Sequence, residues 1–302
     1  MVPPKEPLFE LEQISYRYAG TSVPALENVT LRICRGESVA IVGSNGCGKS
    51  TVLHLLNGLL FPTSGVLRAY GETLTEEGLA RESVAKFFRS RVGFVFQHTE
   101  AQLFCPTVWD EVCFGPLQLD LPSEEVRKRA AEVLRLLGIE SLKDRAPFLL
   151  SGGEKKKVAL ASVISMNPEV LLLDEPESSL DARTQAWLIE FLRILHQSGK
   201  TIVAASHDLS MIDEVATRII VLDESHRLIA DGETDEILMN EDLLLKANLM
   251  HEHIHHHGGE VHRHVHRHIL GHRHSHDRSE IGREIRSPKT WDNVSDSDTH
   301  EI

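Results

Sequence analysis

The chain lacks a long uninterrupted apolar run. Among its 302 residues, the longest candidates, around residues 52–61 and 158–166, are broken by polar residues, whereas a membrane-spanning helix needs roughly 18–20 apolar residues in succession. The first residues, Met-Val-Pro-Pro-Lys-Glu, also lack the charged start and apolar core of a secretory signal. We therefore expect any role at a membrane to be peripheral.

The chain also lacks an excess of positive charge and a cysteine framework. Its 32 Lys and Arg stand against 45 Asp and Glu, which gives a formal net charge of −13 with His counted neutral. An acidic chain argues against a broad footprint on a nucleic-acid backbone, so no nucleic-acid partner is expected. The four cysteines form no C-x-x-C pair, and a chain of this size needs no disulfides. A reducing cytoplasm is the simplest setting.

Short apolar runs alternate with amphipathic stretches up to about residue 250, which is typical of an α/β domain with a largely parallel sheet. We expect Ser123 to cap the second predicted helix and Gly138 to end it. The expected strands are 29–33, 38–42, 92–96, 170–173, 201–205 and 219–222, and the expected helices include 49–57, 124–137, 152–165, 182–197 and 209–216.

The composition changes after residue 250. Residues 251–276 hold 12 of the 18 histidines, and residues 277–302 are polar. Such a tail buries too little apolar surface to offset its ordering entropy, so we expect it to be disordered without a ligand. Neutral imidazole suits Ni, Co, Zn and Cu, which favours a transition-metal site made from the tail histidines. These are His251, His253, His255, His256, His257, His262, His264, His266, His268, His272, His274 and His276.

Composition leaves the use of this tail open. A cluster of histidines also fits a pH-responsive patch of positive charge, since the ring gains a proton near pH 6.5, and it fits neutral low-complexity drift. The tail cannot choose among metals, because Cu²⁺ binds almost any such site most tightly.

Residues 43–51 read Gly-Ser-Asn-Gly-Cys-Gly-Lys-Ser-Thr and match G-x-x-x-x-G-K-[ST] between a predicted strand and a predicted helix. The glycines let backbone N–H groups turn toward phosphates, and the helix N-terminus adds partial positive charge. Lys49 would reach the β- and γ-phosphates, Ser50 would ligate Mg²⁺, and Thr51 would add a hydroxyl near the α-phosphate. The predicted nucleotide site comprises Gly43, Ser44, Asn45, Gly46, Cys47, Gly48, Lys49, Ser50 and Thr51.

The stretch Val170-Leu-Leu-Leu-Asp-Glu175 predicts an apolar strand that ends in two acids. A strand buried on both faces is a continuous apolar run, and α/β folds place ligands at its carboxyl end. Asp174 would hold Mg²⁺ through water, and Glu175 would polarise the attacking water. Taken alone, the pattern more commonly marks a buried strand followed by solvated acids; the phosphate loop favours the catalytic interpretation.

With these two motifs, the sequence Leu150-Ser-Gly-Gly-Glu154 makes residues 8–240 resemble the ATP-binding cassette (ABC) family of ATPases, whose signature it matches. The resemblance implies an α/β P-loop NTPase fold with a parallel-sheet core, an antiparallel β subdomain and a helical subdomain at about 98–165. The cassette would span 1–245, and the tail 246–302. In the family the signature closes over the ATP of a partner subunit, so two cassettes sandwich two ATPs. Here that role falls to Ser151, Gly152, Gly153 and Glu154.

Other positions fit the same resemblance. Gln97 is similar to the glutamine that contacts Mg²⁺ and the attacking water, and His207 to the switch histidine that contacts the γ-phosphate, although a lone histidine after a strand is commonly a solvated loop residue. Asp181 lies in the segment that couples the two sites across the dimer. Tyr18 stands where the family stacks an aromatic on adenine; Tyr16 is the alternative, and either fits simple strand packing.

Two departures from the family pattern are visible. Glu154 stands where many members carry Gln, and Glu177-Ser-Ser179 replaces the commoner Thr-Ser-Gly. Both lie beside the nucleotide rather than on its phosphates, so we expect tuning rather than loss of activity. Because every other motif is present, a homodimer would hold two complete hydrolytic sites.

The stretches Gln102-Leu-Phe104 and Phe114-Gly-Pro116 are similar to energy-coupling-factor importers, especially their cobalt/nickel branch, whereas His98-Thr99 departs from the usual Asn-Pro. Some of these apolar residues also fit ordinary helical core. The resemblance implies an ATPase subunit at the cytoplasmic face of the cell membrane, with ATP and Mg²⁺ as cofactors. It would work with separate transmembrane coupling and substrate-binding subunits, and Ni²⁺ or Co²⁺ would be the ions of the tail.

Three alternatives remain. The transported species is zinc or another micronutrient, such as a cobalamin precursor; the chain is a metal-buffering protein whose cassette regulates it; or it is a soluble ABC ATPase that acts on ribosomes or DNA. The last class usually has two cassettes or long inserted arms, and this chain has neither.

Overall fold

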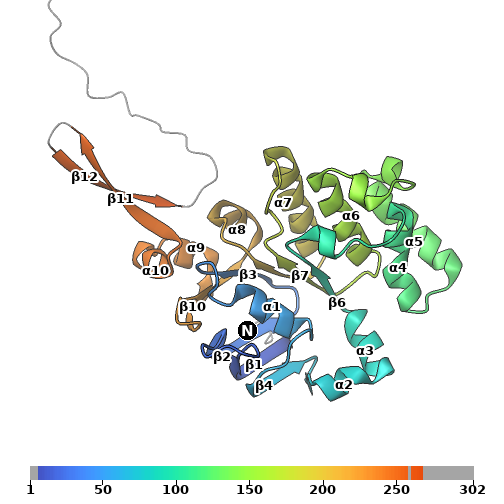
Figure 1. The fold of residues 1–302 in the computed structure, drawn as a ribbon, viewed down its shortest axis with the longest axis horizontal. Helices are drawn as coiled ribbons and strands as arrows, with labels where there is room; N and C mark the ends of the chain where they lie inside the picture. The colour runs from blue at the N-terminus through green and yellow to red at the C-terminus, as the bar shows by residue number, and fades with distance from the viewer. Residues whose placement is uncertain (1–5, 258–259, 268–302) are drawn as a thin grey trace, which may run out of the picture. The chain divides into compact units, whose positions relative to one another are not determined.

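The computed structural model describes the backbone of residues 6–257 and 260–267 and the side chains of residues 6–250. In this part of the chain the cassette contains a four-stranded antiparallel sheet, in the order β2-β1-β4-β5, and a six-stranded sheet, in the order β10-β9-β3-β8-β7-β6 (Figure 1). This arrangement confirms the predicted ABC ATPase fold, with its parallel core and its antiparallel β subdomain.

The antiparallel sheet forms around a long, irregular first strand. Strand β1 (Pro7–Tyr16) pairs with both β2 (Leu26–Cys34) and β4 (Ser64–Ala69). Its register shifts near Gln13, whose φ of 49° places an extra residue in the ladder, as in a β-bulge. Tyr70 and Gly71, both with positive φ, turn the chain from β4 into the short β5 (Glu72–Thr73).

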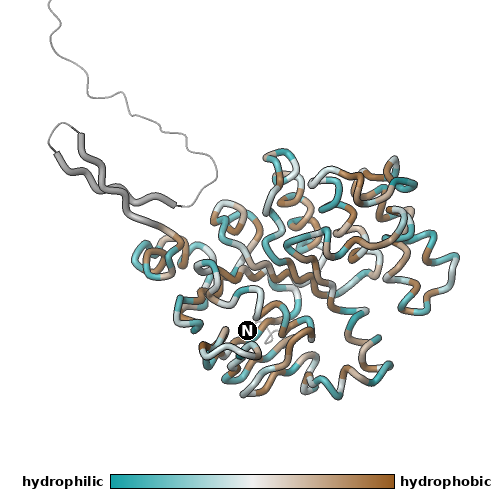
Figure 2. Tube along the Cα trace, in the orientation of Figure 1, coloured by the Kyte–Doolittle hydropathy of each residue, from teal (hydrophilic) through white to brown (hydrophobic). Residues whose placement is uncertain are grey.

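The six-stranded sheet is parallel except for its last strand. It consists of β3 (Ser38–Val42), β6 (Val92–Val95), β7 (Val170–Asp174), β8 (Thr201–Ala205), β9 (Arg218–Leu222) and β10 (Leu228–Glu233), which runs antiparallel to β9. Both faces are buried: Val39 and Ile41 pack in one apolar cluster, and Ala40 and Val42 in another. The central strands are accordingly continuous hydrophobic segments (Figure 2).

Helices cover both faces of this sheet. Helix α1 and the antiparallel sheet share an apolar cluster with one face, and α4–α7 share a cluster with the other. The α-helices are α1 (Lys49–Leu56), α2 (Glu76–Ala80), α3 (Glu82–Arg89), α4 (Val108–Gln118), α5 (Ser123–Leu136), α6 (Gly152–Ile164), α7 (Ala182–Gln197), α8 (Leu209–Val215), α9 (Thr234–Leu238) and α10 (Glu241–Lys246). Short 3₁₀ turns occupy Thr99–Ala101, Glu140–Leu142 and Pro147–Leu149.

One predicted helix cap is wrong. The N-cap of α5 is Pro122, and Ser123 is already the first helical residue, with no capping hydrogen bond from a side chain. The extended Pro122 (ψ 139°) ends the preceding turn, so the helix begins one residue earlier than the serine cap would place it. The predicted stop is confirmed, because Gly138 follows the helix with φ +66°, the left-handed conformation that favours glycine.

The beginning of the tail differs from the disorder that its composition predicts. Its backbone forms two antiparallel strands, β11 (Met250–His257) and β12 (Glu260–Arg267). Histidines recur at every second position over residues 251–255 and 262–266, which is the two-residue period of a strand. His251 stands opposite His266, His253 opposite His264, and His255 opposite His262. The predicted tail ligands His268, His272, His274 and His276 lie outside the described residues.

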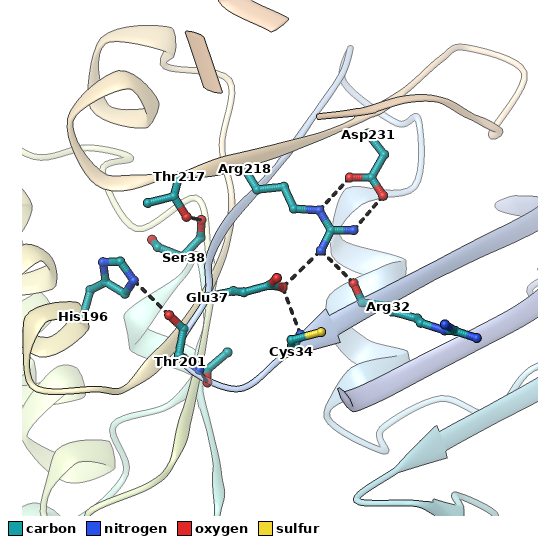
Figure 3. Close-up of polar contacts among 10 residues, drawn as sticks. Arg32, Cys34, Glu37, Ser38, His196, Thr201, Thr217, Arg218 and Asp231 are labelled. Atoms are coloured by element: carbon teal, nitrogen blue, oxygen red, sulfur yellow. Dashed lines mark hydrogen bonds and ion pairs between the residues drawn. The ribbon is translucent and has the colours of Figure 1, made fainter. Parts of the chain in front are cut away.

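A charged network joins the two sheets (Figure 3). The Arg218 guanidinium of β9 donates to both carboxylate oxygens of Asp231 on β10, at 2.6 and 2.7 Å. Its third nitrogen donates to the Arg32 carbonyl of β2, at 2.9 Å, and to Glu37 Oε2, at 3.0 Å. Glu37 Oε2 also accepts from the Cys34 N–H. One arginine therefore fixes the place where the antiparallel sheet meets the parallel one.

In the part of the chain that the structure describes, Cys47, Cys105 and Cys113 form no disulfide bond. Among the described residues, no helix has the length and apolar character that crossing a bilayer requires.

Candidate nucleotide site

Most residues predicted to act on a nucleotide lie just beyond the carboxyl ends of four neighbouring strands. The strand order β3-β8-β7-β6 brings together the loops that carry Gly43–Gly48, His207, Glu175 and Gln97. The registers align these ends, because Ala205 of β8 lies beside both Ile41 of β3 and Asp174 of β7. Parallel strands place ligands at this edge, and the arrangement explains why residues far apart in sequence share one site.

The phosphate loop has a backbone that only glycine permits at two positions. Gly43 has φ +148°, and a Cβ there would lie 2.4 Å from the Leu222 carbonyl oxygen; Gly48 has φ +114°, and a Cβ there would lie 2.4 Å from that of Ala25. Gly48 is the N-cap of α1, so the loop leads directly into the helix N-terminus. Lys49 is 5% exposed, and its Nζ donates to the carbonyls of Gly43 and Ser44, at 2.9 and 3.2 Å. The ammonium thus lies within the loop, where phosphates bind in such motifs.

The predicted magnesium ligands lie next to each other. Ser50 Oγ donates to Asp174 Oδ1 at 3.0 Å. Burial raises the pKa of Asp174, while the hydrogen bond from Ser50 opposes that change. A hydroxyl and a carboxylate are the hard oxygen donors that Mg²⁺ prefers, so this pair fits the ion. When bound, Mg²⁺ would neutralise phosphate charge during hydrolysis.

Two predicted catalytic residues, Gln97 and His207, lie next to the carboxylate of the third, Glu175. Gln97 Nε2 donates to Glu175 Oε2 at 2.8 Å, and His207 Nδ1 lies 3.6 Å from Glu175 Oε1. Glu175 has φ 39°, a conformation that is strained for a residue with a side chain. A carboxylate held between an amide and an imidazole at the end of a strand can accept a proton from water.

A cavity of about 620 Å³ extends from the phosphate loop to Tyr18. Tyr18 is 41% exposed and its hydroxyl lies 3.2 Å from Thr51 Oγ1, whereas Tyr16 packs against the apolar core and contacts Tyr18 edge to face. The cavity therefore favours Tyr18 over Tyr16 as the base-stacking residue, and that role stays a prediction.

Sequence analysis missed other residues that line this cavity: Thr21, Val23, Pro24, Ala25 and His226. Thr21, Val23, Pro24 and Ala25 could have been predicted to line the cavity, because they lie close to Tyr18 in the sequence. His226 comes from the turn before β10, and its Nδ1 has no hydrogen-bond partner among residues 6–250. Nothing in its local sequence indicates that position.

The signature residues lie at the start of α6. Ser151 is the N-cap, its side chain accepts from the Glu154 N–H, and Glu154 Oε2 accepts from both the backbone N–H and the hydroxyl of Ser151, at 2.9 and 2.8 Å. These bonds lower the pKa of Glu154. A second cavity, of about 470 Å³, is lined by Ser151, Gly153, Glu154 and Asp181, and Asp181 caps α7 through the Thr184 N–H, at 3.0 Å. Glu154, which stands where many family members carry Gln, thus completes a capping box with Ser151.

The side chains of the tail histidines lie outside the described residues. Among the side chains that are described, no cluster of three or more His, Cys, Asp or Glu residues could hold a metal ion. Metal binding by the tail therefore stays a prediction.

Comparisons with known proteins agree with this geometry. Residues 26–178 match the family model described as ABC transporter. The chain is 46% identical over 247 residues to the nickel import ATP-binding protein NikO of Rhodobacter capsulatus, a match that covers 81% of this chain and 96% of that protein.

Solved structures extend the similarity to three dimensions. The structure of cbiO1 from Clostridium perfringens, described as part of the ABC transporter complex cbiONQ, has a TM-score of 0.69 and 34% identity, covering 81% of this chain and 96% of that one. The cassette MJ0796, in a dimeric post-hydrolysis state bound to ADP and Pi, has a TM-score of 0.67 and 30% identity, covering 75% and 98%. The motifs, the fold and the comparisons lead to one conclusion: the chain belongs to the ABC transporter family and is an ATP-hydrolysing cassette.

Proposed function

We propose that this cassette powers an energy-coupling-factor importer of nickel or cobalt ions from the cytoplasmic face of the cell membrane. The observation that carries the proposal is the similarity to NikO, which extends over nearly the whole of that protein. Zinc import is the nearest alternative, because the motifs of the cassette bind a nucleotide and do not distinguish among transported metals.

Within this function, each residue of the nucleotide site has a distinct role. Lys49 and the loop N–H groups bind the phosphates, and Ser50, Asp174 and Gln97 hold Mg²⁺. Glu175 accepts the proton of the attacking water, and His207 contacts the γ-phosphate. The contacts that support these roles are the Ser50–Asp174 bond, the Gln97–Glu175 bond and the nearness of His207 to Glu175.

Two copies of the chain would act together. Ser151, Gly152, Gly153 and Glu154 lie at the N-terminus of a 13-residue helix, where N–H groups and the helix dipole favour an anion. Ser151 and Gly152 are exposed and thus accessible to the ATP of a partner subunit. Closure of the dimer would complete both sites, and Asp181 at the start of α7 would couple them.

A groove beside the nucleotide site suits a helix of a membrane partner. This cavity, of about 740 Å³, lies between α3, α4 and α6. Phe104 and Phe114, which are 65% and 40% exposed, meet edge to face at its rim with ring centroids 4.9 Å apart, and Leu59 is 52% exposed. Large exposed apolar side chains commonly mark a protein interface. Gln102 lines this groove and accepts from the N–H of Phe96, the residue that directly precedes Gln97 of the nucleotide site. Its Nε2 donates to the Ala159 carbonyl of α6.

The tail would bind the transported metal on the cytoplasmic side, as a buffer or a feedback sensor. The register of β11 and β12 supports this role, because three pairs of histidine positions stand directly opposite one another. Residues directly opposite in antiparallel strands are the nearest cross-strand neighbours.

The test is the metal content of cells that carry the intact transport system. Nickel, cobalt, zinc and copper are measured by elemental mass spectrometry in cells with the wild-type chain, with Glu175→Gln and with a chain truncated after residue 250. We expect nickel or cobalt alone to fall in Glu175→Gln. A fall in zinc alone would reassign the substrate, and no change in any metal would refute the importer. If truncation abolished buffering but spared uptake, the tail would be accessory.

A further inference from the structure

A second glutamate, Glu177, lies two residues beyond Glu175 and has no role in the scheme above. It is only 5% exposed. Its Oε1 accepts a short hydrogen bond from Ser206 Oγ, and its Oε2 has no hydrogen-bond partner among residues 6–250. Because a buried, incompletely bonded carboxylate is costly, a glutamate at this position needs an explanation other than stability.

Ser206 connects Glu177 to the segment that carries His207. Ser206 follows β8, is fully buried, and its Oγ accepts from the Asp208 N–H at 3.0 Å. Asp208 in turn caps α8 through the Ser210 N–H, at 2.9 Å, and accepts from Gln185 Nε2 of α7, at 2.7 Å. The residues on both sides of His207 are therefore fixed, and the bond to Glu177 fixes the first of them.

Glu177 also lies near the segment that carries Gln97. Lys156 of α6 is 2% exposed, and its Nζ donates to the Gln97 carbonyl at 3.3 Å. Burial lowers the pKa of Lys156, and the negative charge of Glu177 opposes that change more than any other charge does. The charged and titratable groups that act on Glu177 are thus Lys156, His207 and Asp208.

We propose that Glu177 is a positioning residue for ATP hydrolysis, which holds His207 against Glu175 through the Ser206–Asp208 turn. Glu177 stands where the family pattern commonly has Thr. The inference rests on the proposed roles of Glu175 and His207. A shorter side chain would release the turn, and His207 would leave the position in which its Nδ1 lies 3.6 Å from Glu175 Oε1.

The test is the steady-state ATPase activity of the full-length chain with Glu177→Ala, Glu177→Gln, Ser206→Ala and the Glu177→Ala/Ser206→Ala double variant. We expect Glu177→Ala and Ser206→Ala each to lower kcat about 10- to 100-fold, the cost of a small displacement of a catalytic group. KM should stay within about twofold, because no hydrogen bond joins Glu177 to the described phosphate loop. Glu177→Gln keeps an acceptor for Ser206 and should restore kcat to within about threefold of the wild type.

Glu37→Gln is the matched control, because Glu37 is also a hydrogen-bonded carboxylate of low exposure but lies in the network between the sheets. Every kcat is expressed per nucleotide-binding chain, so that partial unfolding cannot imitate a catalytic loss. The double variant should lose no more than either single variant, because both changes break one bond. An unchanged kcat in Glu177→Ala, or losses that multiply in the double variant, would overturn the proposal. Full activity of Glu175→Gln would instead refute the catalytic assignment on which it rests.

Discussion

Replacing Glu175 by glutamine changes one oxygen of the carboxylate into an NH₂ group. In the structure, Oε2 accepts from Gln97 Nε2 at 2.8 Å, and Oε1 lies 3.6 Å from His207 Nδ1. The amide has nearly the same shape and keeps one oxygen that can accept from Gln97. It cannot take a proton from water, so the substitution removes the proposed general base with little change in packing.

The size of the loss follows from that chemistry. General-base catalysis contributes about 10²- to 10⁴-fold in rate, which corresponds to about 3–5 kcal/mol of activation free energy. We therefore expect kcat to fall by about that factor. The affinity for MgATP should stay within about twofold of the wild type, because the hydrogen bonds of Lys49 and Ser50 do not involve Glu175.

The assay combines phosphate release with equilibrium binding of MgATP to the full-length chain. Glu190→Gln, an exposed carboxylate on α7, is the control and should leave both quantities unchanged. If Glu175→Gln hydrolysed ATP within about threefold of the wild-type rate, Glu175 would not be the general base. If it failed to bind MgATP, the loss of turnover would say nothing about proton transfer, and Glu175 would contribute to binding as well as to catalysis.

Three further predictions concern the fold and the phosphate loop. Arg218→Met should lower the free energy of unfolding by about 1–2 kcal/mol, because it removes the bidentate ion pair to Asp231 and the ion pair to the half-buried Glu37; the exposed Arg227→Met should cost under about 1 kcal/mol in the same urea titration. Gly48→Ala should abolish MgATP binding because its Cβ would lie 2.4 Å from the Ala25 carbonyl oxygen, and wild-type affinity in equilibrium binding would contradict the loop geometry. Burial raises the pKa of Tyr70 to about 12, so the unfolded chain releases this proton first, and stability should fall as the pH rises from 10 to 12. Tyr70→Phe should remove up to about 2 kcal/mol of that decline, measured by denaturation at each pH, and an unchanged slope would contradict the assigned burial.

The parallel sheet and the phosphate loop could be predicted from the sequence alone. Strands buried on both faces must be continuously apolar, and β3 and β8 begin and end where that pattern predicts, at Ser38–Val42 and Thr201–Ala205. The glycines of the phosphate loop could likewise be predicted from their local role, because Gly43 and Gly48 occupy positions that only a residue without a Cβ can fill. In both cases the constraint is local, so the residues themselves carry it.

Features that depend on tertiary contacts could not be predicted in this way. Strand β1 pairs with two strands and shifts its register with both, and the sequence alone does not indicate these shifts. His226 reaches the nucleotide cavity from the turn between β9 and β10, far in sequence from the phosphate loop. The family pattern placed Glu177 beside the nucleotide, and its burial against Ser206 becomes visible only when β7 and β8 lie side by side. The cross-strand pairing of the tail histidines likewise depends on a register that composition cannot give.

The most direct test of the proposed function measures transport and hydrolysis on the same sample. The complete complex is reconstituted in liposomes with the cassette and ATP enclosed in the lumen, and the metal ions are added outside. Nickel, cobalt, zinc and copper in the lumen are then assayed alongside phosphate release. We predict that nickel or cobalt accumulates in proportion to the ATP hydrolysed, and that both processes stop together in Glu175→Gln. Hydrolysis at the wild-type rate with no accumulation of any of these metals would contradict the account.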